Sequence, residues 1–277
     1  MRFHERTNTL KYEATLRHVT KGTALYEEGK YSEAIYSFTK AISLEPDTAD
    51  FYRRRGLAYS ELMLLDDAIA DFTKSMELES DNPLHFLNRA LAYIKYGKHE
   101  LAIDDLTWNI SMAQASNEDP KIFSDLYNFR AECYYALNLF EKAAEDATIG
   151  LAFTPDNNDL LNIRCIANKR LKKTDNVIND LLLINKNNPD DDAVYLNLAQ
   201  EYICKGQIDL AKECIDKFFI SDDAYGYAYS IRAYIQQFRG TPDDVRNDFL
   251  KAIELGDENA SAMLEEYEQL LFKKEKN

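Results

Sequence analysis

Residues 16–48 read LRHVTKGTALYEEGKYSEAIYSFTKAISLEPDT, and this stretch decides the fold. Its small residue Gly22 and its Ala34 both return along the chain at a spacing of 34 residues, interrupted once by a spacing of 41. The counterparts of Gly22 are Gly56, Ala90, Ala131, Cys165, Ala199 and Ala233. The counterparts of Ala34 are Ala68, Ala102, Ala143, Val177, Ala211 and Val245. Because two separate positions keep one period, the chain is predicted to be an array of seven copies.

Each copy is predicted to form a pair of helices. Position 4 of a copy is large, position 8 is small, and position 11 is mostly aromatic or aliphatic, so that all three share one helix face. In the second copy these residues are Tyr52, Gly56 and Tyr59, and Phe72 supplies bulk on the second helix. Position 15 marks the turn, since its residues tolerate the left-handed conformation that ends a helix. These residues are Gly29, Gly97, Asn138, Gly206 and Gly240.

The copies divide the chain into five parts. A lead-in (1–14) precedes three copies (15–116), an insertion (117–123), four further copies (124–259) and a C-terminal capping helix (260–277). Apolar residues up to Ala113 predict a lengthened helix before the insertion, and Asp119-Pro120 predicts a cap and first turn after it. Two interpretations of the insertion remain open, a hinge and a longer loop. The capping helix is predicted from one apolar stripe, formed by Met263, Leu264, Tyr267, Leu270 and Leu271.

The pattern resembles the tetratricopeptide repeat (TPR) family over about residues 15–259. The resemblance rests on the large–small–aromatic stripe, on the alanines of the second helices, and on the first copy's Phe38, Ala41 and Pro46. The fifth copy departs most, with Cys165, Asn168 and Val177. The resemblance implies an all-α fold, a right-handed superhelical solenoid of antiparallel helix pairs. The first helix of each pair would line a concave groove.

Composition narrows the classes of function. The net charge of −15 and pI near 4.8 argue against nucleic acid and against anionic membranes as partners, and favour a partner with basic segments. We find no apolar leader and expect a soluble, cytoplasmic protein. The four cysteines, at no pairing or metal spacing, are expected to be buried, reduced thiols. Neither the histidines nor any Ser, Cys or Thr forms a recognisable motif, so no catalytic residue, metal site or cofactor is predicted.

The implied groove is unusually apolar, and contiguous exposed apolar surface marks binding sites. Tight curvature or self-association is the competing explanation for these apolar positions. The candidate groove residues are Arg53, Arg54, Leu84, Leu87, Asn88, Leu91, Asn128, Phe129, Asn162, Ile163, Ile166, Leu196, Asn197, Ile231 and Tyr234. Arg53 and Arg54 face this groove as candidates for an acidic group of the partner. Arg55 belongs instead to a position-7 series expected to pair with carboxylates of neighbouring helices.

Asn88, Asn128, Asn162 and Asn197 recur at about one per copy. A side-chain amide offers a donor and an acceptor, which match one peptide unit of an extended chain. The row is similar to the asparagine ladder of protein O-GlcNAc transferases, although two of the four residues are shifted by one position. The carboxylate clamp of the family's chaperone-binding members is not predicted, because Val19 and Thr23 stand where it requires lysine and asparagine.

These observations predict a non-catalytic scaffold or adaptor that binds an extended or helical segment of another protein in its groove. Two alternatives remain open. One is a structural scaffold that assembles into a homo-oligomer, and the other is a regulatory subunit of an enzyme encoded elsewhere.

Overall fold

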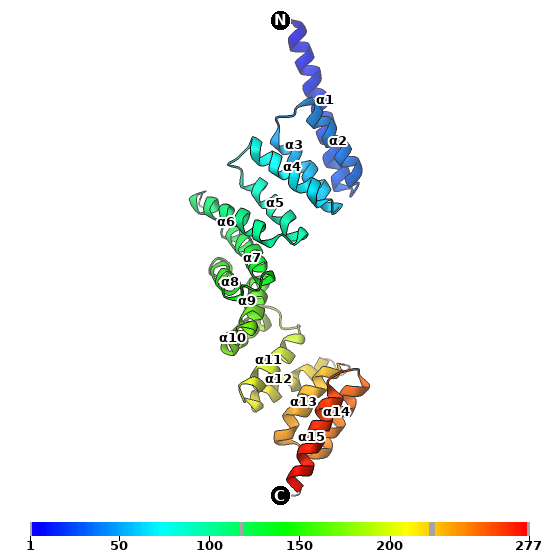
Figure 1. Cartoon of the computed structure of the whole chain (residues 1–277), viewed down its shortest axis with the longest axis vertical. Coiled ribbons are helices and arrows are strands. Elements are labelled where there is room, and N and C mark those ends of the chain that lie inside the picture. The colour runs from blue at the N-terminus through cyan, green and yellow to red at the C-terminus, as the bar shows by residue number, and fades with distance from the viewer. Residues whose placement is uncertain (1, 117–118, 222–224, 276–277) are drawn as a thin grey trace. The chain divides into compact units, whose positions relative to one another are not determined.

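The computed structural model describes residues 2–116, 119–221 and 225–275, and within these ranges it contains fifteen α-helices and no strand (Figure 1). The prediction of an all-α fold is confirmed. The helices are α1 (Arg2–Glu27), α2 (Tyr31–Leu44), α3 (Ala49–Glu61), α4 (Leu65–Leu78), α5 (Pro83–Tyr96), α6 (His99–Ser116), α7 (Pro120–Ala136), α8 (Phe140–Phe153), α9 (Asn158–Arg170), α10 (Thr174–Asn187), α11 (Ala193–Cys204), α12 (Ile208–Ser221), α13 (Gly226–Arg239), α14 (Pro242–Glu254) and α15 (Ala260–Glu275).

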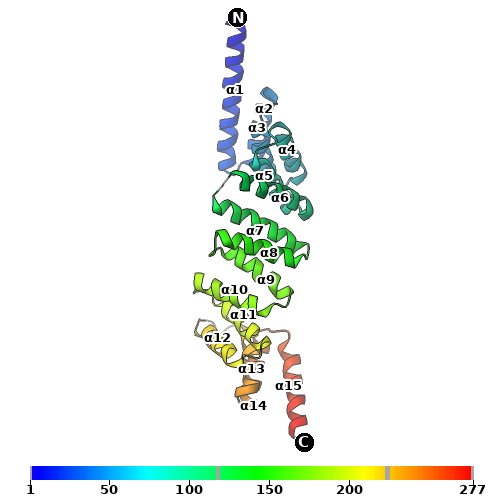
Figure 2. The same cartoon turned by 90° about the vertical axis from the view of Figure 1, so that its left-hand side faces the viewer.

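The chain forms two compact units. Unit 1 is Met1–Thr154 and holds α1 to α8, and unit 2 is Pro155–Asn277 and holds α9 to α15. In each unit, an odd-numbered helix and the even-numbered helix after it pack against one another as a pair, and successive pairs stack (Figure 2). The predicted part boundaries at 14, 116, 123 and 259 remain predictions. The insertion falls inside unit 1, and its Asn117 and Glu118 lie outside the described residues.

The turns between paired helices use the left-handed conformation in six of the seven copies. Glycine takes it with φ between 70° and 77° at Gly29, Gly97 and Gly206. Residues with side chains take it at Met63, Asn138 and Lys172, with φ between 57° and 59°. The prediction was wrong for Gly240, whose φ is −105°. The backbone at Gly240 is extended and leads into a capping box at the start of α14. There the Thr241 hydroxyl accepts a hydrogen bond from the backbone N–H of Asp244 at 3.2 Å.

An arginine–aspartate pair joins the two helices of five copies, which confirms the structural role expected for the Arg55 series. The two residues are 16 apart and bond through two nitrogens and two oxygens, as fork-shaped charge pairs do. The pairs are Arg55–Asp71, Arg89–Asp105, Arg130–Asp146, Arg164–Asp180 and Arg232–Asp248. In the sixth copy the equivalent residues are Leu198 and Cys214, and both are buried. An apolar pair therefore replaces both charges together and leaves neither unpaired.

Small residues at position 8 make room for a ring on the second helix. A Cβ built on Gly22 would lie 2.7 Å from Cε1 of Phe38, and one built on Gly56 would lie 2.8 Å from Cε1 of Phe72. Carbon atoms pack at about 3.5–4.0 Å, so a methyl group at either glycine would push the ring away. The glycines therefore permit the close packing of the first and second helices.

The first and the last helix of the chain differ from the helices between them. Positions 3 and 10 are buried in all six later copies, whereas the first copy has the exposed Arg17 and Ala24 there. At the other end, α15 packs on α14 through Tyr267, which joins a core with Phe249 and is flanked by Met263, Leu264 and Leu271. Of the predicted apolar stripe, only Leu270 points into solvent, with 47% of its surface exposed.

The helix before the insertion is long, as predicted, and the helix after it is long as well. α6 has 18 residues and α7 has 17, compared with 14 in α4 and α5. Asp119 caps α7 by accepting the backbone N–H of Lys121 at 2.8 Å, and Pro120 is the first helical residue. The insertion thus extends two helices of the standard array.

Three of the four cysteines are buried, and the expectation fails for Cys204. Cys204 is exposed and is the last residue of α11. Burial raises the pKa of Cys133 to about 12, and that of both Cys165 and Cys214 to about 11. None of the helices in the described ranges is long and apolar enough to cross a bilayer.

Candidate peptide-binding surface

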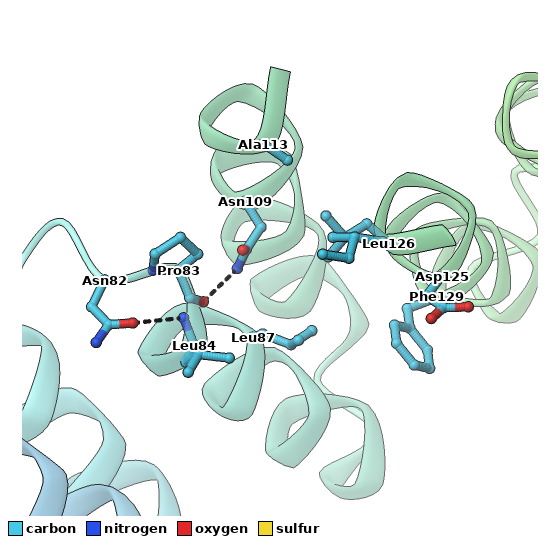
Figure 3. A pocket seen from close by; sticks show the side chains of 10 residues that line it. Asn82, Pro83, Leu84, Leu87, Asn109, Ala113, Asp125, Leu126 and Phe129 are labelled. Atoms are coloured by element: carbon cyan, nitrogen blue, oxygen red, sulfur yellow. Dashed lines mark hydrogen bonds between the residues drawn. The ribbon is translucent and has the colours of Figure 1, made fainter. Parts of the chain in front are cut away.

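An apolar hollow of unit 1 lies where the two lengthened helices meet α5. It is a cavity of about 460 Å³ between the start of α5, the end of α6 and the start of α7 (Figure 3). Apolar side chains make up most of its wall. The lining residues are Asn82, Pro83, Leu84, Leu87, Asn109, Ala113, Ile122, Asp125, Leu126 and Phe129.

Local sequence fixes the α5 side of this cavity. Asn82 caps α5, since its Oδ1 accepts the backbone N–H of Leu84 at 3.1 Å, and Pro83 is the first helical residue (Figure 3). Leu84 and Leu87 then follow within one helical turn and reach the same space. Leu84 keeps 54% of its surface exposed, so apolar area is available to a partner.

The α6 and α7 sides combine residues of the standard helix pairs with Ala113 and Ile122 from the lengthened parts. Asn109 and Ala113 are one turn apart on α6, and Asn109 points to the start of α5, where its Nδ2 donates to the carbonyl of Pro83 at 3.1 Å (Figure 3). On α7, Asp125 and Phe129 are also one turn apart and therefore share a face (Figure 3). Leu126 is buried and forms the floor together with the core of this region.

Three of the predicted groove residues, Leu84, Leu87 and Phe129, are brought together in this cavity. Asn88 and Leu91 lie half-buried on the same helix as the two leucines but do not line it. The other seven lining residues were not predicted. The signal that could have found Ala113 and Ile122 is the spacing of 41 residues between the third and fourth copies, since the extra residues lengthen the helices that hold them.

Arg53 and Arg54 are already engaged within the protein. Both bond to the carboxylate of Asp50, and Arg54 Nη1 also donates to the Thr23 hydroxyl at 3.0 Å. They line a small cleft of about 130 Å³ with the rings of Tyr26 and Phe38. Their charge is therefore partly neutralised before any acidic group of a partner arrives.

The predicted asparagines differ in depth. Asn128 is buried, with 9% of its surface exposed, and its Nδ2 donates to Glu132 at 3.0 Å. Asn197 is exposed, and its amide donates to the carbonyl of Ala193 in its own helix at 3.1 Å. Asn88 is half-buried and Asn162 is exposed. Because Asn88 and Asn128 belong to unit 1 and the other two to unit 2, the asparagine row stays a prediction.

The predicted groove residues of unit 2 are partly buried in its interior. Ile163, Leu196 and Ile231 have 8%, 7% and 5% of their surface exposed, so they pack inside unit 2, where the sequence predicted an open surface. Ile166 keeps an exposed face, and Tyr234 is half-buried.

No constellation for metal chemistry accompanies these surfaces. Over residues 2–116, 119–221 and 225–275, no group of three or more His, Cys, Asp or Glu side chains is placed to hold a metal ion. The described surface offers apolar area, amides and isolated charges.

The stacked antiparallel helix pairs, with an apolar hollow between the first helices of two pairs, define a helical-repeat scaffold. A family model described as TPR repeat matches residues 22–62, in unit 1. A second, described as tetratricopeptide repeat, matches residues 193–219, in unit 2. The chain is a tetratricopeptide repeat protein, and this fold serves as a scaffold for protein–protein interaction. The models match two of the seven predicted copies.

Solved structures agree with this fold. The C-terminal part of a TPR repeat-containing protein from Cytophaga hutchinsonii aligns with a TM-score of 0.74 at 17% identity, covering 88% of this chain and 98% of that one. A tetratricopeptide repeat protein from Parabacteroides merdae aligns with a TM-score of 0.60 at 19% identity, covering 91% and 98%. YrrB, described as a TPR protein with an unusual peptide-binding site, aligns with a TM-score of 0.55 at 18% identity, covering 65% and 90%. No curated protein matches the sequence.

Proposed function

We propose that the chain is a non-catalytic adaptor that binds a segment of a partner protein, and that the cavity between α5, α6 and α7 is its principal contact. The observation that carries the proposal is the apolar wall of this cavity, with the exposed Leu84 at its edge. Ligand sites of proteins enclose roughly 300–1,000 Å³ and are mostly apolar, and this cavity falls in that range. The resemblance to YrrB, itself described as having a peptide-binding site, supports the same class of ligand.

Further predicted residues extend this proposal along the helices. Asn88 and Leu91 continue the surface on α5, and in unit 2 the exposed Asn162 and Ile166 offer an amide beside an apolar side chain. Such a combination suits an extended segment, because amides bind peptide groups while apolar residues cover side chains. We expect these positions to contribute less than the cavity, since they enclose no volume of their own.

Selection of binding peptides tests the proposal. A random library of 12-residue peptides on phage is selected on the full chain and then compared on two variants, Leu84→Glu and Leu101→Glu. Both leucines lie in the first turn of a helix of unit 1 and are about half exposed, but only Leu84 lines the cavity. We expect the selected peptides to bind wild type and Leu101→Glu and to lose binding to Leu84→Glu. Peptides indifferent to Leu84→Glu would contradict the proposed site.

Self-assembly is the second candidate function, favoured by the same exposed apolar side chains, which a second copy could cover. Light-scattering mass measured against concentration separates the two. A mass that stays at one chain at micromolar concentration supports the adaptor, and an oligomer that Leu84→Glu dissociates supports self-assembly. Regulation of an enzyme encoded elsewhere stays an alternative function, and the proposed location of the protein is the cytoplasm.

A further inference from the structure

We infer that the segment bound in the cavity carries one or two large apolar side chains and, within about four residues of them, a lysine or arginine that pairs with Asp125. The inference rests on the proposed function and adds to it the chemistry of the partner. It follows from the size of the cavity, from the state of its polar atoms and from its single charged lining residue.

The volume sets the size of the apolar part. A cavity of ~150 Å³ holds a benzene ring, and the one described here is about 460 Å³. It therefore accommodates more than one ring-sized group. Two side chains from one helical turn, or one aromatic side chain with its neighbour, match this space.

The amide groups of the wall are already used. Asn82 accepts from the backbone of Leu84 and donates to Glu79 at 3.1 Å, and Asn109 donates to the carbonyl of Pro83. These bonds lie within the protein around the start of α5. What the wall offers an incoming segment is therefore removal of apolar area from water, which favours apolar side chains.

Asp125 is the charged residue among those that line the cavity. It is exposed, and no ion pair to it occurs among the described residues, although Lys121 lies one turn earlier on the same helix. It lies beside Phe129 on the face of α7 that looks onto the cavity (Figure 3). An apolar segment that covers this carboxylate removes water from it. This desolvation costs free energy unless an opposite charge takes the place of the water.

The charge of the whole chain favours the same partner. The net charge is −15, so a basic segment is attracted over distance and an acidic one is repelled. The carboxylate of Asp125 and the net charge of the chain therefore both favour a positively charged segment. A segment with an apolar anchor and a nearby lysine or arginine satisfies both the wall and Asp125.

The selection described above supplies the probes. The most enriched 12-residue peptide is synthesised with a fluorescein label, and its Kd is measured by polarisation with wild type, Asp125→Lys and Asp104→Lys. Asp104 is exposed on α6 and does not line the cavity, so it controls for the change in overall charge. We expect basic residues in the enriched peptides and a loss of about tenfold or more with Asp125→Lys, the range of close charge pairs at interfaces. With Asp104→Lys we expect a change of less than about threefold.

A charge reversal completes the test. The peptide in which its lysine or arginine is replaced by glutamate is expected to bind wild type weakly and to regain binding to Asp125→Lys. Peptides that lose binding to Leu84→Glu but are indifferent to Asp125→Lys would overturn this inference and leave the proposed function standing. If no selected peptide depends on Leu84, both fail. An oligomer that Leu84→Glu dissociates would make a second copy the occupant and would also overturn the inference.

Discussion

The fourth arginine–aspartate pair provides the sharpest test of how the helix pairs are held together. Arg130 Nε lies 2.7 Å from Asp146 Oδ2 and Nη2 lies 2.8 Å from Oδ1, and the side chain of Asp146 is only 6% exposed. Replacing Arg130 by leucine leaves this carboxylate buried without its partner. Breaking a buried pair in this way costs about 3–5 kcal/mol.

The sixth copy indicates how to remove the same pair without that cost. Leu198 and Cys214 occupy the equivalent positions there, both buried. The double variant Arg130→Leu with Asp146→Cys copies them and leaves no unpaired charge. We expect it to be destabilised by about 1 kcal/mol or less, since apolar replacement of a buried ion pair is often neutral. A double-mutant cycle should then give a coupling of at least ~2 kcal/mol.

Urea unfolding followed by Trp108 fluorescence is the assay. Trp108 is the single tryptophan of the chain, and it is adjacent to Thr107, whose hydroxyl accepts from Arg130 at 3.0 Å. With a slope of about 2 kcal/mol per molar urea, the Arg130→Leu variant should unfold about 1.5–2.5 M earlier than wild type. If the double variant were as unstable as the sum of the two single variants, the reasoning about the unpaired charge would be refuted.

Four further predictions concern stability and reactivity. Gly56→Ala should destabilise by about 1–3 kcal/mol because its methyl group would lie 2.8 Å from the Phe72 ring, and adding Phe72→Leu should recover most of the loss in urea unfolding. Lys172→Gly should stabilise by about 0.5–1 kcal/mol, because φ is 57° there, and a lowered thermal midpoint would contradict this. The pKa of Asp50 lies below its ordinary value, since burial, which opposes the charged form, is outweighed by hydrogen bonds from the two arginines next to it on α3. The stabilisation that the Asp50 carboxylate contributes is therefore present above the unfolded pKa of about 3.9 and is lost as the pH falls through the lower folded pKa. The thermal midpoint of Asp50→Asn should lie below that of wild type at pH 7, and the two midpoints should converge as the pH falls below about 4. At pH 8 a thiol reagent should modify Cys204 rapidly and the three buried cysteines only on unfolding, and fast reaction of a second thiol would contradict the burial.

Much of the helix pairing could be predicted from the sequence, because each contact is repeated. The position-7 arginines and the small residues at position 8 recur with one period, and chance does not maintain a period. Gly226 shows what periodicity misses. It has no counterpart in the other copies, yet a Cβ there would lie 2.9 Å from the carbonyl oxygen of Ala252, a contact that only the folded chain reveals.

The binding surface was harder to predict than the fold. Ile163 and Ile231 occupy positions that pattern alone places on the open side, but the stacking of neighbouring helices buries them. Ile122 and Ala113 line the cavity because the insertion lengthens α7 and α6, and an insertion has no period to read. Asp125 stands at position 2 of its copy, as Leu84 does, but an apolar pattern passes over a carboxylate. Repetition therefore predicts what the copies share, whereas the candidate site arises where one copy differs.

The exposed Arg17 of the first copy has a consequence for how molecules of this protein meet in solution. In a stack of similar pairs, the surface that receives the next pair is also a surface that a second molecule could occupy, and such head-to-tail contacts propagate into fibres. Arg17 on α1 makes such a contact costly at the first copy, since its guanidinium would lose water on burial with no opposite charge to replace it. One charged side chain thus disfavours an end-to-end assembly that the repeated architecture would otherwise permit.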